Sequence, residues 1–247
     1  MTILQNLDRL HESVRSDVEA YCHKVISALG PGVKSISAYG SATGPDFIRG
    51  KSNVNLVIVA ADLSQSVLTR LLEVVKWGAK RKIVPPLLLT ADYIATSLDV
   101  FAIEFAEIKA DQVLLMGEDH FSSIDVVPAH LRLECESQLK SAVLRTRQAY
   151  LEVGLAKKGA ESVLHTSLTS LIPVFRAMLR LKGVEVPRPK LDVVRSVGEV
   201  FGVDTEPFVA ILKDKAGDEK IGGKEAHGVL GDYVTRVEEL AARVDKL

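Results

Sequence analysis

Cysteine is scarce in this chain of 247 residues, which contains two, Cys22 and Cys135. The two positions are far apart and lack the close spacing of metal-binding cysteines, so the sequence indicates neither a zinc site nor a disulfide framework. The first fifteen residues carry charges and lack the apolar core of a signal peptide. We therefore predict a cytoplasmic protein with reduced thiols.

Long apolar runs and an excess of charge of either sign are also missing. A membrane-spanning helix needs about 20 predominantly apolar residues, and no segment approaches that length. Lysine and arginine number 31 against 32 aspartates and glutamates, which gives a formal net charge of −1. Because nucleic-acid-binding domains usually carry a basic surface, we expect neither a membrane nor a nucleic-acid partner.

Several motifs of well-known sites are missing as well. The six histidines show no HExxH or other paired ligand spacing. The run Gly40-Ser41-Ala42-Thr43-Gly44 lacks the lysine of a phosphate-binding P-loop. Neither a Rossmann fingerprint nor a serine nucleophile elbow occurs. The stretch from Tyr39 to Val59, YGSATGPDFIRGKSNVNLVIV, then becomes the most informative part of the chain.

This stretch joins the ends of two predicted strands through a polar loop. Val33 to Tyr39 has the apolar pattern of a strand that ends at Gly40, where glycine permits a positive φ and a close backbone approach. Ser41 follows and offers a hydroxyl and an amide N–H to an anion. After a loop of eleven residues, Asn53-Val54-Asn55 opens the second strand, Leu56 to Val59.

The two asparagines decide what chemistry this layout can support. Asn53 and Asn55 are two residues apart, so their side chains lie on one face of the strand. Two aspartates there would bind Mg²⁺ and present it to a triphosphate. An amide oxygen adds no negative charge and cannot act as a base. Since two unit charges in contact interact by on the order of 4 kcal/mol at an effective dielectric near 20, we expect weak metal binding and slow or absent catalysis.

The layout resembles the nucleotidyltransferase fold of the DNA polymerase β superfamily. That pattern is a hydrophobic residue, Gly, Gly or Ser, a loop, and then Asp-hydrophobic-Asp/Glu. Tyr39, Gly40, Ser41 and the alternating strand match it, whereas Asn53 and Asn55 replace the acids. The resemblance covers about residues 30 to 120, and small bacterial members such as the aminoglycoside nucleotidyltransferases add a C-terminal helical domain.

The resemblance implies a third carboxylate on a later strand, together with Mg²⁺ and a nucleoside triphosphate in an active member. Glu104 fits best by position, in the apolar run Val100 to Ile108 that we predict as a strand, and Glu107 is the second choice. Asn53, Asn55 and Glu104 are thus the candidate catalytic and metal positions, in a vestigial form. No metal is expected to bind them.

The loop supplies two cations beside the glycine–serine turn. Arg49 and Lys51 can contact a triphosphate, so we group them with Gly40 and Ser41 as candidate nucleotide- or phosphate-binding residues. The alternative is that both cations are ordinary solvated side chains. For Asn53 and Asn55, the alternative is that their amides satisfy backbone groups at the start of the strand.

Periodicity divides the chain into an α/β part and a helical part. Further short strands are predicted at 87–89 and 113–116, which gives a mixed sheet. From Pro128 onward the pattern is helical throughout, with the most apolar helix at 160–181. We predict a nucleotidyltransferase-like α/β domain over 1–125 and an all-α helical bundle over 126–247.

Three functional hypotheses follow from these observations. The first is a catalytically impaired, nucleotidyltransferase-like protein whose cleft still binds a nucleotide or another anion in a regulatory or binding role. The alternative is an active Mg²⁺-dependent nucleotidyltransferase that moves a nucleoside monophosphate to a hydroxyl of a small molecule or a protein. The third is a structural, dimer-forming protein whose cleft binds no ligand. A homodimer is compatible with all three.

Overall fold

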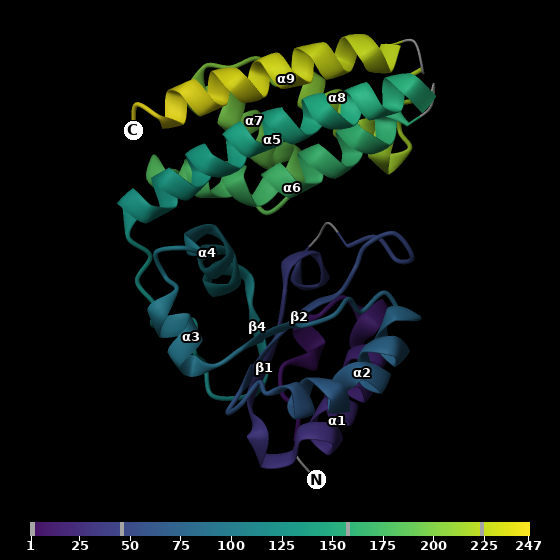
Figure 1. The fold of residues 1–247 in the computed structure, drawn as a ribbon, viewed down its shortest axis with the longest axis vertical. Coiled ribbons are helices and arrows are strands. Elements are labelled where there is room, and N and C mark those ends of the chain that lie inside the picture. Colours follow the sequence, from purple (N-terminus) through teal and green to yellow (C-terminus); the bar gives the residue numbers. More distant parts are fainter. Residues whose placement is uncertain (1–2, 45–46, 157–158, 223–224) are drawn as a thin grey trace. The chain divides into compact units, whose positions relative to one another are not determined.

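The computed structural model describes residues 3–44, 47–156, 159–222 and 225–247 (Figure 1). The chain divides into two compact units, Met1–Val126 and Val127–Leu247, called here the N-terminal unit and the C-terminal unit. The N-terminal unit combines a sheet with helices, and the C-terminal unit is helical. The predicted fold class, an α/β part followed by a helical part, is confirmed.

A mixed sheet forms the centre of the N-terminal unit. Within the described residues its order is β3-β2-β1-β4. Strand β1 runs antiparallel to both β2 and β4, while β3 runs parallel to β2. The strands are β1 (Val33–Tyr39), β2 (Asn55–Ala60), β3 (Leu87–Leu89) and β4 (Val113–Gly117).

Helices cover both faces of this sheet, so alternate residues of the central strands are buried on opposite sides. Helices α1 (Arg15–Leu29) and α2 (Gln65–Ala79) contribute to one apolar cluster. Helices α3 (Ala91–Thr96) and α4 (Ala102–Asp111) contribute to the other. The first cluster includes the strand residues Ile36, Ala38, Leu56 and Ile58. The second includes Val57, Val59 and the partly buried Tyr39.

The predicted strand from Val100 to Ile108 is wrong, because this segment forms helix α4. Phe101, Ile103 and Phe105 alternate with other residues and suggested a strand period of two. In the structure, burial follows helical spacing instead, with Ala102, Phe105, Ala106 and Ile108 turned inward. The run also contains alanine, glutamate and lysine, which favour helices.

The C-terminal unit is a helical bundle, as predicted. Helix α6 packs against each of the other four helices described in this unit, so it forms the centre of the bundle. Pro128 begins the first helix, a position where its missing N–H has no cost. The helices are α5 (Pro128–Ala156), α6 (Ala160–Leu181), α7 (Lys190–Phe201), α8 (Glu206–Ala216) and α9 (Glu225–Val244).

Among the residues that the structure describes, no helix is both long and apolar enough to cross a lipid bilayer. Cys22 and Cys135 are free thiols buried in α1 and α5. Burial raises the pKa of each thiol to about 12.

Candidate functional site

The turn after β1 is built around Gly40, which has a φ of +75°. A methyl group placed on this residue would lie 3.1 Å from the Asn55 Nδ2 atom. Glycine is therefore required both for its backbone conformation and for the space that the Asn55 amide occupies. Thr43 closes the turn, since its Oγ1 donates a hydrogen bond of 2.7 Å to the Gly40 carbonyl oxygen.

The structure brings both asparagines to this turn. Asn55 is the cross-strand partner of Tyr39 in the β1–β2 pair. Ser41 Oγ donates to the Asn53 carbonyl oxygen at 3.4 Å, a long bond that places the two residues side by side. Antiparallel pairing of β1 with β2 thus joins Gly40, Ser41, Asn53 and Asn55 at one edge of the sheet.

The side-chain amides of both asparagines are left without an internal partner. Asn53 is exposed and Asn55 is half-buried. Within the described residues, neither amide forms a hydrogen bond to the protein. The interpretation that they satisfy backbone groups at the strand start therefore finds no support here. Both amides remain able to donate to, or accept from, a bound molecule.

Glu104 reaches the same region from a helix rather than from a strand. The Tyr39 hydroxyl donates a hydrogen bond of 3.1 Å to Glu104 Oε1, which links the end of β1 to the first turn of α4. Burial and the adjacent Glu104 carboxylate raise the pKa of Tyr39, so the hydroxyl keeps its proton and acts as the donor. Glu104 thus has a tyrosine as its partner, and its role in the candidate site stays a prediction.

Sequence reasoning missed this role of Tyr39, which entered the pattern only as the hydrophobic residue before Gly40. One signal was present. Tyr39 is directly opposite Asn55 across the β1–β2 pair, and residues directly opposite in an antiparallel pair project to the same face. The sequence alone could not show that Glu104, 65 positions after Tyr39, would contact Tyr39 on this face of the sheet.

The positively charged loop residues occupy the segment that leads into β2. Ile48 N–H donates to Ser52 Oγ at 2.9 Å, and Ser52 N–H donates to the Ile48 carbonyl oxygen at 2.8 Å, so a closed turn holds this segment. Arg49 and Lys51 are exposed on that turn. Their contact with an anion stays a prediction. Pro45 and Asp46 of the same loop lie outside the described residues.

The residues present do not suit the divalent ion that the polymerase β superfamily uses. Of the three predicted positions only Glu104 is a carboxylate, and it already accepts a hydrogen bond from Tyr39. Strands β3 and β4 read LLL and VLLMG, so neither supplies an acid beside β2 or β1. In the described part of the chain, no three His, Cys, Asp or Glu side chains form a group that could hold a metal ion.

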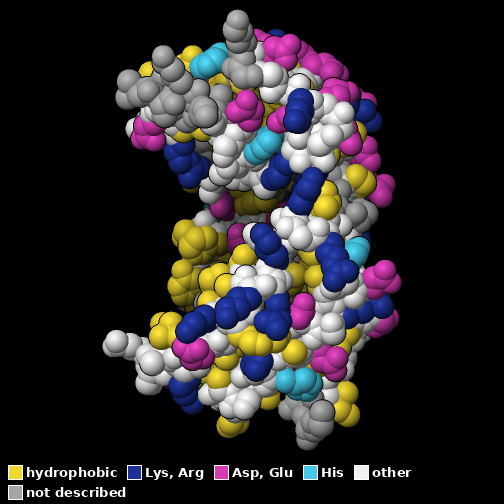
Figure 2. Space-filling model, turned by 90° about the vertical axis from the view of Figure 1, so that its right-hand side faces the viewer, with side chains coloured by type: hydrophobic (Ala, Val, Ile, Leu, Met, Phe, Trp, Pro, Cys, Tyr) yellow, Lys and Arg dark blue, Asp and Glu magenta, His cyan; other side chains and the backbone are white. Residues whose placement is uncertain are grey.

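A second polar surface lies between α1 and α2. Figure 2 shows lysine and arginine side chains gathered over the N-terminal unit on the side of these helices. The Arg81 guanidinium carbon lies 3.7 Å from the centre of the Trp77 ring, and Arg81 Nε is 3.1 Å from Asp17 Oδ1. Lys24 Nζ lies 5.1 Å from the same ring centre. These contacts join α1 to the end of α2 and give the basic residues there a structural role.

Comparison with solved structures identifies the fold. Spectinomycin adenyltransferase AAD(9) from Enterococcus faecialis, in a crystal structure with ATP and spectinomycin, matches with a TM-score of 0.62 and 10% sequence identity, over 90% of this chain and 99% of that chain. A nucleotidyltransferase-like protein from Exiguobacterium sibiricum 255-15 matches with a TM-score of 0.37 and 13% identity, over 90% of this chain and 74% of that chain. No protein-family model and no curated protein matches the sequence. The first match shows the fold and confirms the predicted resemblance: the chain has a nucleotidyltransferase fold like that of the aminoglycoside nucleotidyltransferases.

Proposed function

We propose that the N-terminal unit binds a nucleotide or a related phosphate-bearing anion at the Gly40–Ser41 turn without a divalent ion, and that it does not transfer nucleotidyl groups at enzymatic rates. The observation that carries this proposal is that the Asn55 amide lies beside Gly40 and that, within the part of the chain that the structure describes, the amides of Asn53 and Asn55 form no hydrogen bond to the protein. They give the turn hydrogen-bonding capacity without negative charge. A free polyphosphate is then attracted by Arg49 and Lys51 and is not repelled by carboxylates.

The same geometry explains why transfer is not expected. Nucleotidyl transfer needs stabilisation of the charge that develops on the phosphate and activation of the attacking hydroxyl. Amides do not take up a proton from that hydroxyl. Glu104 accepts a hydrogen bond from Tyr39, so the phenol hydroxyl already engages its carboxylate. We therefore assign the turn a binding role, which suits a regulatory protein.

Calorimetric titration with ATP tests the binding part of this proposal, since ATP is the nucleotide in the crystal structure of the spectinomycin adenyltransferase. We expect ATP to bind in EDTA, and we expect Mg²⁺ to leave the affinity unchanged or to lower it, because the ion neutralises phosphate charge without finding carboxylates. The double variant Asn53→Asp/Asn55→Asp should bind ATP at least tenfold more weakly in EDTA and should regain affinity with Mn²⁺. The matched variant Asn53→Ala/Asn55→Ala removes the amides and should gain no metal dependence.

Incubation with labelled ATP, GTP, CTP and UTP tests the catalytic part. We expect no transfer to protein or to small hydroxyl compounds with either Mg²⁺ or Mn²⁺. Turnover at ordinary enzymatic rates would establish the active alternative instead. The absence of heat and of a thermal shift at millimolar ATP would contradict the binding role and favour a cleft without a ligand.

A further inference from the structure

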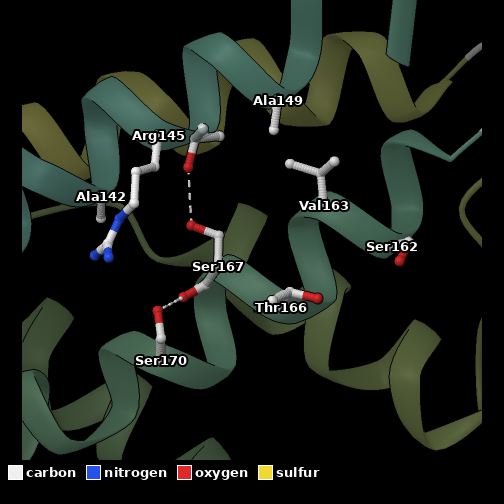
Figure 3. A pocket seen from close by; sticks show the side chains of 9 residues that line it. Ala142, Arg145, Ala149, Ser162, Val163, Thr166, Ser167 and Ser170 are labelled. Carbon is white, nitrogen blue, oxygen red and sulfur yellow. Dashed lines mark hydrogen bonds between the residues drawn. The ribbon is translucent and has the colours of Figure 1, made fainter. Parts of the chain in front are cut away.

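A pocket of about 380 Å³ lies between α5 and α6 of the C-terminal unit, in a part of the molecule that the nucleotide proposal does not use (Figure 3). Pockets for small ligands commonly start near 300 Å³, so this space is large enough for a small organic molecule. Two helices supply its walls. The lining residues are Ala142, Arg145, Thr146 and Ala149 of α5, and Ser162, Val163, Thr166, Ser167 and Ser170 of α6.

The polar side chains of the lining can all donate hydrogen bonds, and the hydroxyls among them can also accept. Five of them are hydroxyls and the sixth is the guanidinium of Arg145. Among the residues that the structure describes, no carboxylate lines the pocket, and Arg145 is the charged side chain of the lining. A ligand with acceptor atoms and a negative charge fits this composition.

A chain of hydroxyls connects the wall of the pocket with the core of the bundle. Thr146 Oγ1 lies 2.9 Å from Ser167 Oγ, and Ser167 Oγ lies 2.7 Å from the Tyr233 hydroxyl (Figure 3 shows the first contact). Each hydroxyl has one proton to donate. Tyr233 is 1% exposed, and burial raises its pKa, so it keeps its proton in the core. Either hydroxyl of each pair can be the donor. If Tyr233 donates to Ser167 and Ser167 donates to Thr146, the Thr146 proton is left for another acceptor.

This direction leaves the Thr146 proton free at the wall of the pocket. Thr146 is itself 2% exposed, and a buried donor without an acceptor is unfavourable. An acceptor atom of a ligand in the pocket would satisfy it. With this donor direction, a ligand oxygen at the pocket wall would accept the Thr146 proton.

Two arginines of α5, Arg145 and Arg147, differ in whether an ion pair already engages the guanidinium. Arg147 Nη2 pairs with Glu238 Oε1 at 2.6 Å, which ties α5 to α9. Arg145 is exposed at the pocket and has no ion pair within the described ranges of the chain. Its guanidinium can therefore hold a carboxylate or a phosphate through two parallel hydrogen bonds.

We propose that the α5–α6 pocket binds a small organic anion, with its oxyanion group on Arg145 and the pocket hydroxyls and its apolar part against Ala142, Ala149 and Val163. Carboxylates and phosphate esters share the chemistry that these residues recognise. The pocket rejects cations and favours anions over neutral molecules of the same shape. This binding is independent of the Gly40–Ser41 turn.

A series of probes with one apolar body tests the proposal. Benzoate and phenyl phosphate are the anions, benzyl alcohol is the neutral probe and benzylamine is the cation. We expect at least one anion to bind saturably, with a dissociation constant below roughly 10 mM. Binding is measured through the NMR chemical shifts of backbone amides in α5 and α6. The neutral and cationic probes should bind at least tenfold more weakly. Comparison of the two anions then distinguishes a carboxylate ligand from a phosphate ligand.

Two arginine variants make the test specific. Arg145→Gln should weaken anion binding at least tenfold, because it removes a charge-assisted hydrogen bond. Arg147→Gln changes the same kind of residue outside the pocket and should leave binding unchanged. Equal binding of benzylamine, an undiminished affinity in Arg145→Gln, or no saturable shift with either anion would each overturn the proposal. Asn53→Asp/Asn55→Asp should not affect these probes, so this result and that of the ATP titration are distinguishable.

Discussion

The amides of Asn53 and Asn55 and the missing side chain of Gly40 set the chemistry of the turn after β1. The asparagines supply donors and acceptors without charge, and Gly40 leaves the space that the Asn55 amide fills. A nucleotide that approaches this turn meets backbone, hydroxyl and amide groups. In the binding role proposed above, the affinity of the nucleotide would depend on the fit of its phosphates to these groups rather than on a bridging ion.

Replacement of Gly40 by alanine tests this view at a single position. A positive φ disfavours alanine, so Gly40→Ala should lower the free energy of unfolding by about 1–2 kcal/mol. The new methyl group would lie 3.1 Å from the Asn55 Nδ2 atom and would push the amide aside. We therefore expect the affinity for ATP to fall at least tenfold. Thermal unfolding and calorimetry measure the two effects.

Gly183→Ala provides the matched control for this substitution. Gly183 has a φ of +66°, and an added methyl group there would meet no atom within 4 Å. We expect a similar loss of stability with unchanged ATP binding. If both variants lose the same affinity for ATP, the effect comes from reduced stability and the turn is not the binding site.

Secondary-structure elements show which parts of the site can be inferred from sequence. The predicted bounds of β1 coincide with Val33–Tyr39, since an apolar pattern and a following glycine define them locally. The juxtaposition of the glycine–serine turn with Asn53 and Asn55 also follows from a local strand–loop–strand unit. The placement of Glu104 does not follow from local sequence. The run from 100 to 108 fits both the strand period of two and the helix period of 3.6, and packing on the sheet selects the helix.

The hydrogen bond between Tyr39 and Glu104 predicts how firmly α4 is held on the sheet. Tyr39→Phe removes one solvent-exposed hydrogen bond to a charged group and should lower the free energy of unfolding by about 0.5–1 kcal/mol. Tyr93→Phe is the control, since Tyr93 is 46% exposed on α3, and it should change stability by less than about 0.5 kcal/mol. Equal melting temperatures of Tyr39→Phe and the parent protein would show that this bond does not stabilise the unit.

The distribution of ionisable groups over the whole molecule makes its stability sensitive to alkaline pH. Each unit buries a thiol, Cys22 or Cys135, whose pKa rises from 9.0 to about 12. Burial also raises the pKa of Tyr21 from 10.0 to about 12. Tyr39 and Tyr233 shift in the same direction. All five groups therefore stay protonated in the folded protein at pH values where the unfolded chain releases their protons.

The sign of the resulting pH dependence follows from linkage. Above pH 9 the unfolded chain binds fewer protons than the folded protein, so the free energy of unfolding falls as the pH rises toward the folded pKa values. A thiol whose pKa is 9.0 in the unfolded chain and about 12 in the folded protein lowers the free energy of unfolding at pH 10 by about 1 kcal/mol relative to neutral pH. We expect melting temperatures, measured by calorimetry, that decline from pH 9 to pH 10.5. The decline should be shallower in Cys22→Ala/Cys135→Ala, whatever stability the two substitutions cost at pH 7. A slope equal to that of the parent protein would mean that the buried thiols do not control the alkaline limit, and the tyrosines would then have to account for it.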